Sequence, residues 1–233
     1  MNCATCSKAE NMKLAAALIF IFFSIFFWAF FEQSGGSLSL FALNNLHPSL
    51  LGITVDTNSV NNSANSLFVI AFSALAGLFW LWLSKRKAEP NSVVKFGFGF
   101  LFLAAGFYIF KSTLGFADAN GITSTEVFTF AWFVITFGEL CLSPIGLSLM
   151  TKLSPVRIQG LMMGMWFLAS AYGQYAAGLL GAGMSAENPD ATNYDKLVLY
   201  TEGYGHLGLY ALIAGAALII LSPLVRKLMR EVH

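Results

Sequence analysis

The stretch F-F-W-A-F-F-E-Q-S-G-G-S-L-S-L-F-A-L, residues 26–43, decides the fold because it places polar groups inside a strongly apolar segment. It continues an apolar run over residues 14–31 that is broken only by Ser24. A helix through this run reaches well into a bilayer and carries Glu32 and Gln33 with it. A carboxylate is costly there and usually faces a bundle interior or a wet cavity. Glu32 is therefore a candidate functional residue; the alternative is a side chain that snorkels at the outer membrane edge.

The composition places the whole chain in the membrane class. Hydrophobic residues make up 57% of the 233 residues and charged residues only 11%, whereas about a quarter of an ordinary soluble domain is charged. The 23 phenylalanines suit lipid-facing surfaces and cavity walls better than a water-soluble core. A formal net charge of +1 gives no reason to expect a nucleic acid partner.

Apolar runs long enough to cross roughly 30 Å of hydrocarbon as helices recur along the chain. They predict an all-α membrane protein, a six-transmembrane-helix bundle over residues 14–226, with cytoplasmic ends at residues 1–13 and 227–233. The first run is too long for a cleaved signal peptide and is expected to tilt, or to bend at Gly35-Gly36. The predicted spans are residues 14–43, 63–84, 92–112, 125–150, 157–183 and 204–225.

The basic residues set the expected orientation in the membrane. Of the 13 lysines and arginines, all but Lys111 and Lys196 fall on one side of the predicted bundle. The positive-inside rule makes that side cytoplasmic and puts both termini inside. We therefore expect a multi-pass protein of the cytoplasmic (inner) membrane, with the lipid bilayer as its surroundings.

Neither a metal site nor an enzyme is expected. Cys3 and Cys6 form one C-x-x-C, but a structural zinc site needs four ligands, and no second pair or nearby histidine follows. Cys141 is interpreted as a small packing residue. The sequence holds no H-E-x-x-H or G-x-S-x-G motif, and its three histidines lie in or near loops and the terminus.

A second acid lies deeper than Glu32, in G-E-L-C-L-S-P-I-G at residues 138–146. Glu139 is about fourteen residues from the outer end of its span, roughly 20 Å of helix, and so near mid-membrane. Ser143 at i+4 shares its face, and Pro144 frees a backbone carbonyl nearby. No lysine or arginine lies deep in any predicted span to pair with Glu139. Three interpretations stay open: a buried structural acid, a proton carrier, or a site for a cationic ligand group.

Two further residues have competing interpretations. Trp166 lies near the middle of its span rather than in an interfacial belt. It is interpreted either as a lipid-facing side chain or as a functional one. Asn65, near the start of the second span, is interpreted from the residues alone as a helix cap. The fifth span also carries small residues suited to close helix packing, namely Gly160, Gly164, Ala169, Gly173, Ala177 and Gly181.

Three motifs together resemble a known family. They are F-W-A-F-F-E-Q-S-G-G-S-L at residues 27–38, G-E-L-C-L-S-P-I-G-L at 138–147 and G-L-M-M-G-M-W-F-L at 160–168. They are similar to the seventh, tenth and eleventh helices of the proton-dependent oligopeptide transporters (POT/PTR family), a branch of the major facilitator superfamily. The resemblance runs from about residue 14 to the C-terminus.

The resemblance implies roles for particular residues. Glu139 would bind the free amino group of a peptide, with Ser143 close by, while Trp166 would line a side-chain pocket. Asn65 would also contact peptide, although the family often has Asn-Pro where this chain has Asn65-Ser66. Glu32 would act in proton coupling and in the outer gate, and it is grouped there with Gln33, Gly35 and Gly36.

The chain departs from the family pattern because the E-x-x-E-R motif of the family's first helix does not occur in it. It therefore resembles the C-terminal half of the fold, from a truncated record, an interrupted reading frame or a half-transporter with a separate partner. A zwitterionic peptide needs an opposite charge for each end, and this half supplies carboxylates without an embedded cation. The reading frame immediately upstream would separate these possibilities.

The expected function is proton-coupled symport of di- and tripeptides by alternating access, with this chain supplying the C-terminal half of the site. The driving force would be the proton gradient, without a cofactor. The expected partners are the peptide, protons and an N-terminal six-helix half. The alternative is a transport-inactive six-helix membrane module.

Overall fold

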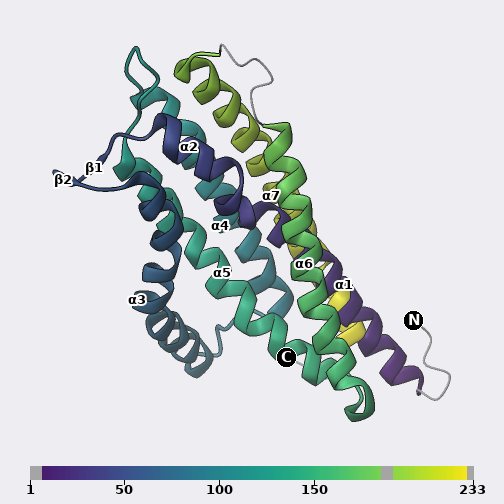
Figure 1. Cartoon of the computed structure of the whole chain (residues 1–233). Helices are drawn as coiled ribbons and strands as arrows, with labels where there is room; N and C mark the ends of the chain where they lie inside the picture. Colours follow the sequence, from purple (N-terminus) through teal and green to yellow (C-terminus); the bar gives the residue numbers. More distant parts are fainter. Residues whose placement is uncertain (1–6, 185–190, 230–233) are drawn as a thin grey trace.

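A computed structural model describes residues 7–184 and 191–229 (Figure 1). Cys3 and Cys6, the predicted ends before residue 7 and after residue 229, and the loop at 185–190 lie outside these residues. The described chain is nearly all helical, and the predicted all-α bundle is confirmed. Its α-helices are α1 (Lys8–Phe31), α2 (Ser37–Asn45), α3 (Thr57–Lys85), α4 (Ser92–Ser112), α5 (Thr125–Leu153), α6 (Gln159–Gly183) and α7 (Asn193–Met229).

The first helix begins earlier than predicted, inside the segment 1–13. Ser7 and Glu10 form a capping box: the Glu10 backbone N–H donates to the Ser7 hydroxyl at 3.2 Å, and the Ser7 N–H donates to the Glu10 carboxylate at 2.7 Å. These bonds satisfy two backbone groups that a helix start otherwise leaves open. The helix therefore starts at Lys8, before the apolar run begins.

Other helices also extend past their predicted spans, for the same reason. The Asp56 carboxylate accepts from the Ser59 N–H at 2.6 Å, so α3 starts at Thr57 rather than 63. Thr192 and Asp195 exchange hydrogen bonds between side chain and backbone, and α7 starts at Asn193 rather than 204. At their other ends α5 and α7 continue to Leu153 and Met229. Hydropathy marks the lipid-embedded part of a helix, whereas caps mark its ends.

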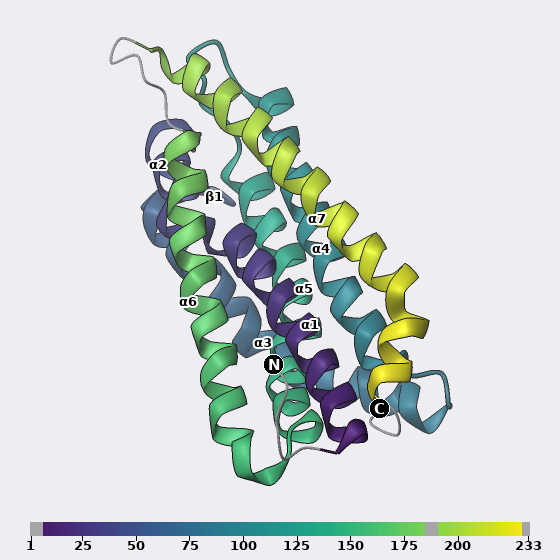
Figure 2. The ribbon, with the colours of Figure 1, turned by 90° about the vertical axis from the view of Figure 1, so that its right-hand side faces the viewer.

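Five helical segments of the described chain are long and apolar enough to cross a membrane. The first of them, Lys8–Asn45, joins α1 and α2. The remaining helix of the predicted six, α6, has 25 residues but falls short in apolar character because glycines, glutamines and tyrosines dilute it. It packs along α1, and α1 and α6 run side by side in both views (Figures 1 and 2). Packing thus keeps α6 in the bundle.

The first span breaks at the predicted bend. A 3₁₀ turn, η1 (Glu32–Gly35), follows α1, and Gly36 then leads into α2. A Cβ on Gly36 would lie 3.9 Å from the Gly181 Cα, so the break rests directly on the backbone of α6. The site residues Glu32 and Gln33 lie in this turn.

Close helix contacts at glycines hold the bundle together. The α4–α7 pair has the most extensive contact, and in it a Cβ on Gly97 would lie 2.7 Å from the Ile219 side chain. In α6, Gly173 approaches α1, since its Cβ would lie 2.5 Å from the Trp28 Cβ. Gly160 and Gly164 have no described atom within 4 Å of such a Cβ. The predicted small-residue packing is therefore confirmed in the C-terminal half of α6 and wrong for its first turns.

The start of α1 and the end of α7 lie at one end of the bundle (Figures 1 and 2). The opposite end carries a short antiparallel hairpin, β1 (Ser49–Leu50) and β2 (Ile53–Thr54). Asn45 at the end of α2 closes this end, donating to the carbonyls of Gly121 at 2.9 Å and Asn193 at 2.7 Å. The polar residues described next lie between these two ends.

Candidate functional site

The Glu139 carboxylate accepts a hydrogen bond from an asparagine side chain on a neighbouring helix. The Asn65 Nδ2 of α3 donates to the Glu139 Oε2 of α5 at 2.9 Å and to the Thr136 Oγ1 at 3.2 Å. Asp56 caps α3, so the interpretation of Asn65 as a helix cap is wrong. Thr136 was not predicted, although it lies three residues before Glu139 and so shares its helix face. Asn65, Thr136 and Glu139 form the first half of the site.

Glu139 has no cationic partner in the described chain. The ion pairs found there join Lys95 to Glu89 and Arg157 to Glu10. Glu139 is half-buried, and so is Ser143 one turn further along α5. The carboxyl group thus has an amide to orient it and stays partly exposed within this chain.

Glu32 forms the second half of the site, at the break in the first span. It is half-buried, and its carboxylate accepts a hydrogen bond from the Gln174 Nε2 of α6 at 3.4 Å. This contact holds the Glu32 side chain against α6, whereas a snorkelling side chain would extend toward the membrane edge. Gln174 was missed because no sequence motif marked it.

Gln33 has different contacts from its neighbour Glu32. Its side chain is fully buried, and its Nε2 donates to the carbonyls of Ala29 at 3.1 Å and Ala177 at 3.2 Å. Its Oε1 accepts from the Ser37 hydroxyl at 2.8 Å. One amide therefore ties α1, α2 and α6 together across the break. Gly35 is exposed, and Gly36 lies against α6.

Asn61 connects the break to the other half of the site. It is buried, and its Nδ2 donates to the Ser34 carbonyl at 3.0 Å and to the Ser39 hydroxyl at 3.3 Å. Sequence reasoning missed it, although Asn61 and Asn65 are four residues apart and share one face of α3. Two successive turns of α3 therefore contact the Glu32 turn and Glu139.

Trp166 is 4% exposed, so the interpretation as a lipid-facing side chain is wrong. Its ring packs edge-on against Phe96 of α4, with centroids 6.2 Å apart, and covers Gly146 of α5. It fills the junction of α4, α5 and α6. A role in a side-chain pocket stays a prediction.

Gly146→Ala is expected to destabilise the protein by about 1–3 kcal/mol, the usual cost of overpacking a core. The new Cβ would lie 2.0 Å from the Trp166 Cη2, so the indole must move. The apparent unfolding free energy in a detergent titration measures this. Gly164→Ala is the control, because no described atom lies within 4 Å of its Cβ. Adding Trp166→Phe, which removes the colliding ring atoms, should recover part of the loss; no recovery would contradict the assigned contact.

The described residues contain no group of three His, Cys, Asp or Glu side chains that could hold a metal ion. The site consists of two carboxyl groups, their amide partners and a helix break, and this arrangement can bind a cationic group or exchange a proton. No nucleophile is paired with a base in it.

Comparison with known proteins gives consistent results. The chain is 34% identical over 98% of its length to the peptide transporter YePEPT of Yersinia enterocolitica. It is 29% identical over 93% of its length to dipeptide and tripeptide permease B of Aeromonas hydrophila. A crystal structure of the peptide transporter POT in complex with sulfate superposes with a TM-score of 0.82 at 27% identity, covering 98% of the chain. These relatives are transporters and not enzymes.

The chain spans about 43% of the length of each of these three proteins. The family model described as "PTR2: POT family" matches residues 1–196. That range takes in the Glu32 turn, the Glu139 helix and the Trp166 motif. On this evidence the chain belongs to the POT family.

Proposed function

We propose that this chain supplies the C-terminal half of a proton-coupled symporter of di- and tripeptides. In this proposal Glu139 binds the peptide's α-ammonium group, with Asn65 and Ser143 beside it. The relatives named as peptide transporters and permeases support the substrate class. The proton gradient drives transport, and no cofactor takes part.

The Asn65–Glu139 hydrogen bond is the observation that carries the proposal. Asn65 occupies one oxygen of the carboxylate and leaves the other for a ligand. An ammonium group offers three donors and a full positive charge, which compensates the cost of a carboxylate in a low-dielectric setting. A neutral ligand would leave that charge unpaired.

Glu32 is the proposed proton-responsive group. Its carboxylate accepts a hydrogen bond from Gln174 of α6, and Asn61 of α3 contacts the turn that carries it. Protonating Glu32 removes a negative charge from the α1 break and weakens its bond to Gln174. Proton uptake at the α1 break would thereby be coupled to the state of the peptide site.

A second six-helix half completes the proposed transporter. The described face of the chain offers carboxylates for the peptide's amino end, whereas the peptide's carboxylate needs a cation from elsewhere. The N-terminal half is the proposed source of that cation. We also propose that the chain lies in the cytoplasmic membrane with both termini inside, from its lysine and arginine distribution.

The test is uptake of a radiolabelled dipeptide into proteoliposomes that contain this chain together with the N-terminal six-helix half of a POT relative. An inward proton gradient is expected to drive accumulation, and an uncoupler should abolish it. Liposomes with either half alone are the controls. Equal uptake with and without this chain would contradict the proposal, and so would uptake that ignores the gradient.

A further inference from the structure

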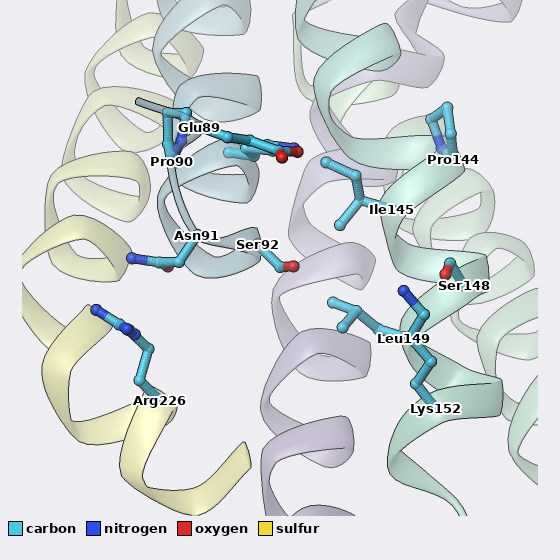
Figure 3. Close-up of a pocket in the computed structure, with 11 residues that line it drawn as sticks. Glu89, Pro90, Asn91, Ser92, Pro144, Ile145, Ser148, Leu149, Lys152 and Arg226 are labelled. Atoms are coloured by element: carbon cyan, nitrogen blue, oxygen red, sulfur yellow. The ribbon is translucent and has the colours of Figure 1, made fainter. Parts of the chain in front are cut away.

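A polar cavity of about 600 Å³ lies where the α3–α4 loop meets α5 and α7. Figure 3 shows Arg226 rising from α7 toward Asn91 and Lys152 extending along α5 beside Ser148. Glu89 and Lys95 also line it. It lies at the end of the bundle where α7 ends, and its lining shares no residue with the proposed peptide site, although Pro144 directly follows Ser143 on α5.

The cavity has an excess of positive charge. Lys95 is buried and forms an ion pair with Glu89. That hydrogen bond from Lys95 holds the pKa of Glu89 below its usual range, so Glu89 stays charged and neutralises Lys95. Within the described ranges, Lys152 and Arg226 have no acidic group within 4 Å. Two cations of the cavity are therefore available to an anion.

An apolar groove of about 540 Å³ adjoins the cavity. Its walls come from α3, α4 and α5; α3 and α4 each pack against α5 and have few contacts with each other. Its apolar lining includes Leu75, Phe79, Phe98, Phe102, Phe137 and Leu140. Pro90 lines both the groove and the cavity. The Lys95 ammonium also lies 4.5 Å from the centre of the Trp80 ring, which faces the groove.

We propose that the cavity and groove together bind an anionic phospholipid, its headgroup in the cavity that Lys152 and Arg226 line from opposite walls and one acyl chain between α3 and α4. Charge complementarity selects the headgroup, since guanidinium and ammonium groups pair strongly with phosphate. The adjoining apolar groove selects a lipid over a soluble anion, because a soluble anion has no apolar chain to fill the groove. An uncharged lipid would likewise leave the two cations unpaired.

The experiment is native mass spectrometry of the purified full chain, titrated with phosphatidylglycerol or phosphatidylcholine in detergent. Phosphatidylglycerol is expected to stay bound and phosphatidylcholine to dissociate. The double variant Lys152→Gln/Arg226→Gln should bind phosphatidylglycerol on the order of 30-fold more weakly. The matched control Lys85→Gln/Lys227→Gln removes the same charge from exposed positions that do not line the cavity, and should bind like the unaltered chain.

The groove is tested separately. Phosphatidylglycerol with brominated acyl chains should quench tryptophan fluorescence of the unaltered chain through Trp80, and Ala76→Phe, which fills the groove, should weaken that quenching. Ala74→Phe on the exposed side of α3 is the control. Equal binding of both lipids would overturn the proposal, as would full competition by inorganic phosphate with no effect of Ala76→Phe. The comparison of lipids on the unaltered chain decides the case even if a variant does not fold.

Discussion

Glu139→Gln is expected to reduce gradient-driven dipeptide uptake on the order of 100-fold when the N-terminal half is supplied. The substitution keeps the shape of the side chain and an oxygen that can accept from the Asn65 amide. It removes the charge that an ammonium group requires, and losing one partner of a buried charge pair typically costs about 2–5 kcal/mol. The measurement is the initial rate of uptake at a peptide concentration well below saturation.

Glu126→Gln provides a matched control on the same helix. Glu126 accepts from the Leu51 N–H and the Ser124 hydroxyl at the hairpin end of α5, away from Asn65. Its variant is expected to transport like the unaltered chain. If Glu139→Gln also kept full uptake, the assignment of Glu139 to the ammonium group would be wrong, whereas loss of uptake by both variants would show that any charge change in α5 is disruptive.

The fold could be predicted from the sequence because the bilayer permits few solutions. Apolar runs of sufficient length in a chain that is 57% hydrophobic must become helices, since a backbone in hydrocarbon has to satisfy its own hydrogen bonds. Helix ends were less predictable. They depend on single caps such as Ser7 and Asp56, which lie outside the apolar runs. Hydropathy alone also misses helices: α6 is not apolar enough to count as a span, because a helix packed against its neighbours needs less apolar surface.

The candidate site could be predicted where a polar residue interrupts an apolar run. Glu32 and Glu139 are conspicuous for that reason, and the structure gives each an amide partner from another helix. Gln174, the partner of Glu32, and Asn61, which contacts the turn after Glu32, were missed because they lie among other polar or small residues. Which residues pair across helices depends on how the helices pack and rotate. One sequence does not contain that information in a local pattern.

The contacts of α3 link Glu32 and Glu139 to each other. Asn61 contacts the turn after Glu32, and Asn65 contacts Glu139. A displacement of α3 relative to α1 and α5 would change both contacts together. The helix lends itself to such a displacement, since most of its surface is exposed within this chain. Gln33 bonds to α1, α2 and α6, so it belongs to the part of the break that stays fixed when α3 moves.

Gln33→Leu is therefore expected to destabilise the protein by about 2–3 kcal/mol, the cost of leaving buried polar groups without partners. The variant keeps a side chain of similar size but removes the bonds to the carbonyls of Ala29 and Ala177 and to the Ser37 hydroxyl. Unfolding by a denaturing detergent, followed by circular dichroism, measures the loss. Ser37→Ala in the Gln33→Leu background should restore about 1 kcal/mol, because it removes one of the stranded groups.

Gln174→Leu is the matched control, since it removes the same type of side chain from another contact between the Glu32–Gly35 turn and α6. Gln174 is exposed, and its single described bond to Glu32 is long at 3.4 Å. We expect its effect on stability to stay within about 0.5 kcal/mol, while the proton dependence of uptake shifts because Glu32 loses its partner. Gln33→Leu should show the opposite pattern, a large loss of stability at an unchanged proton dependence. Equal stability of the two variants would show that the break in the first span is not held by Gln33.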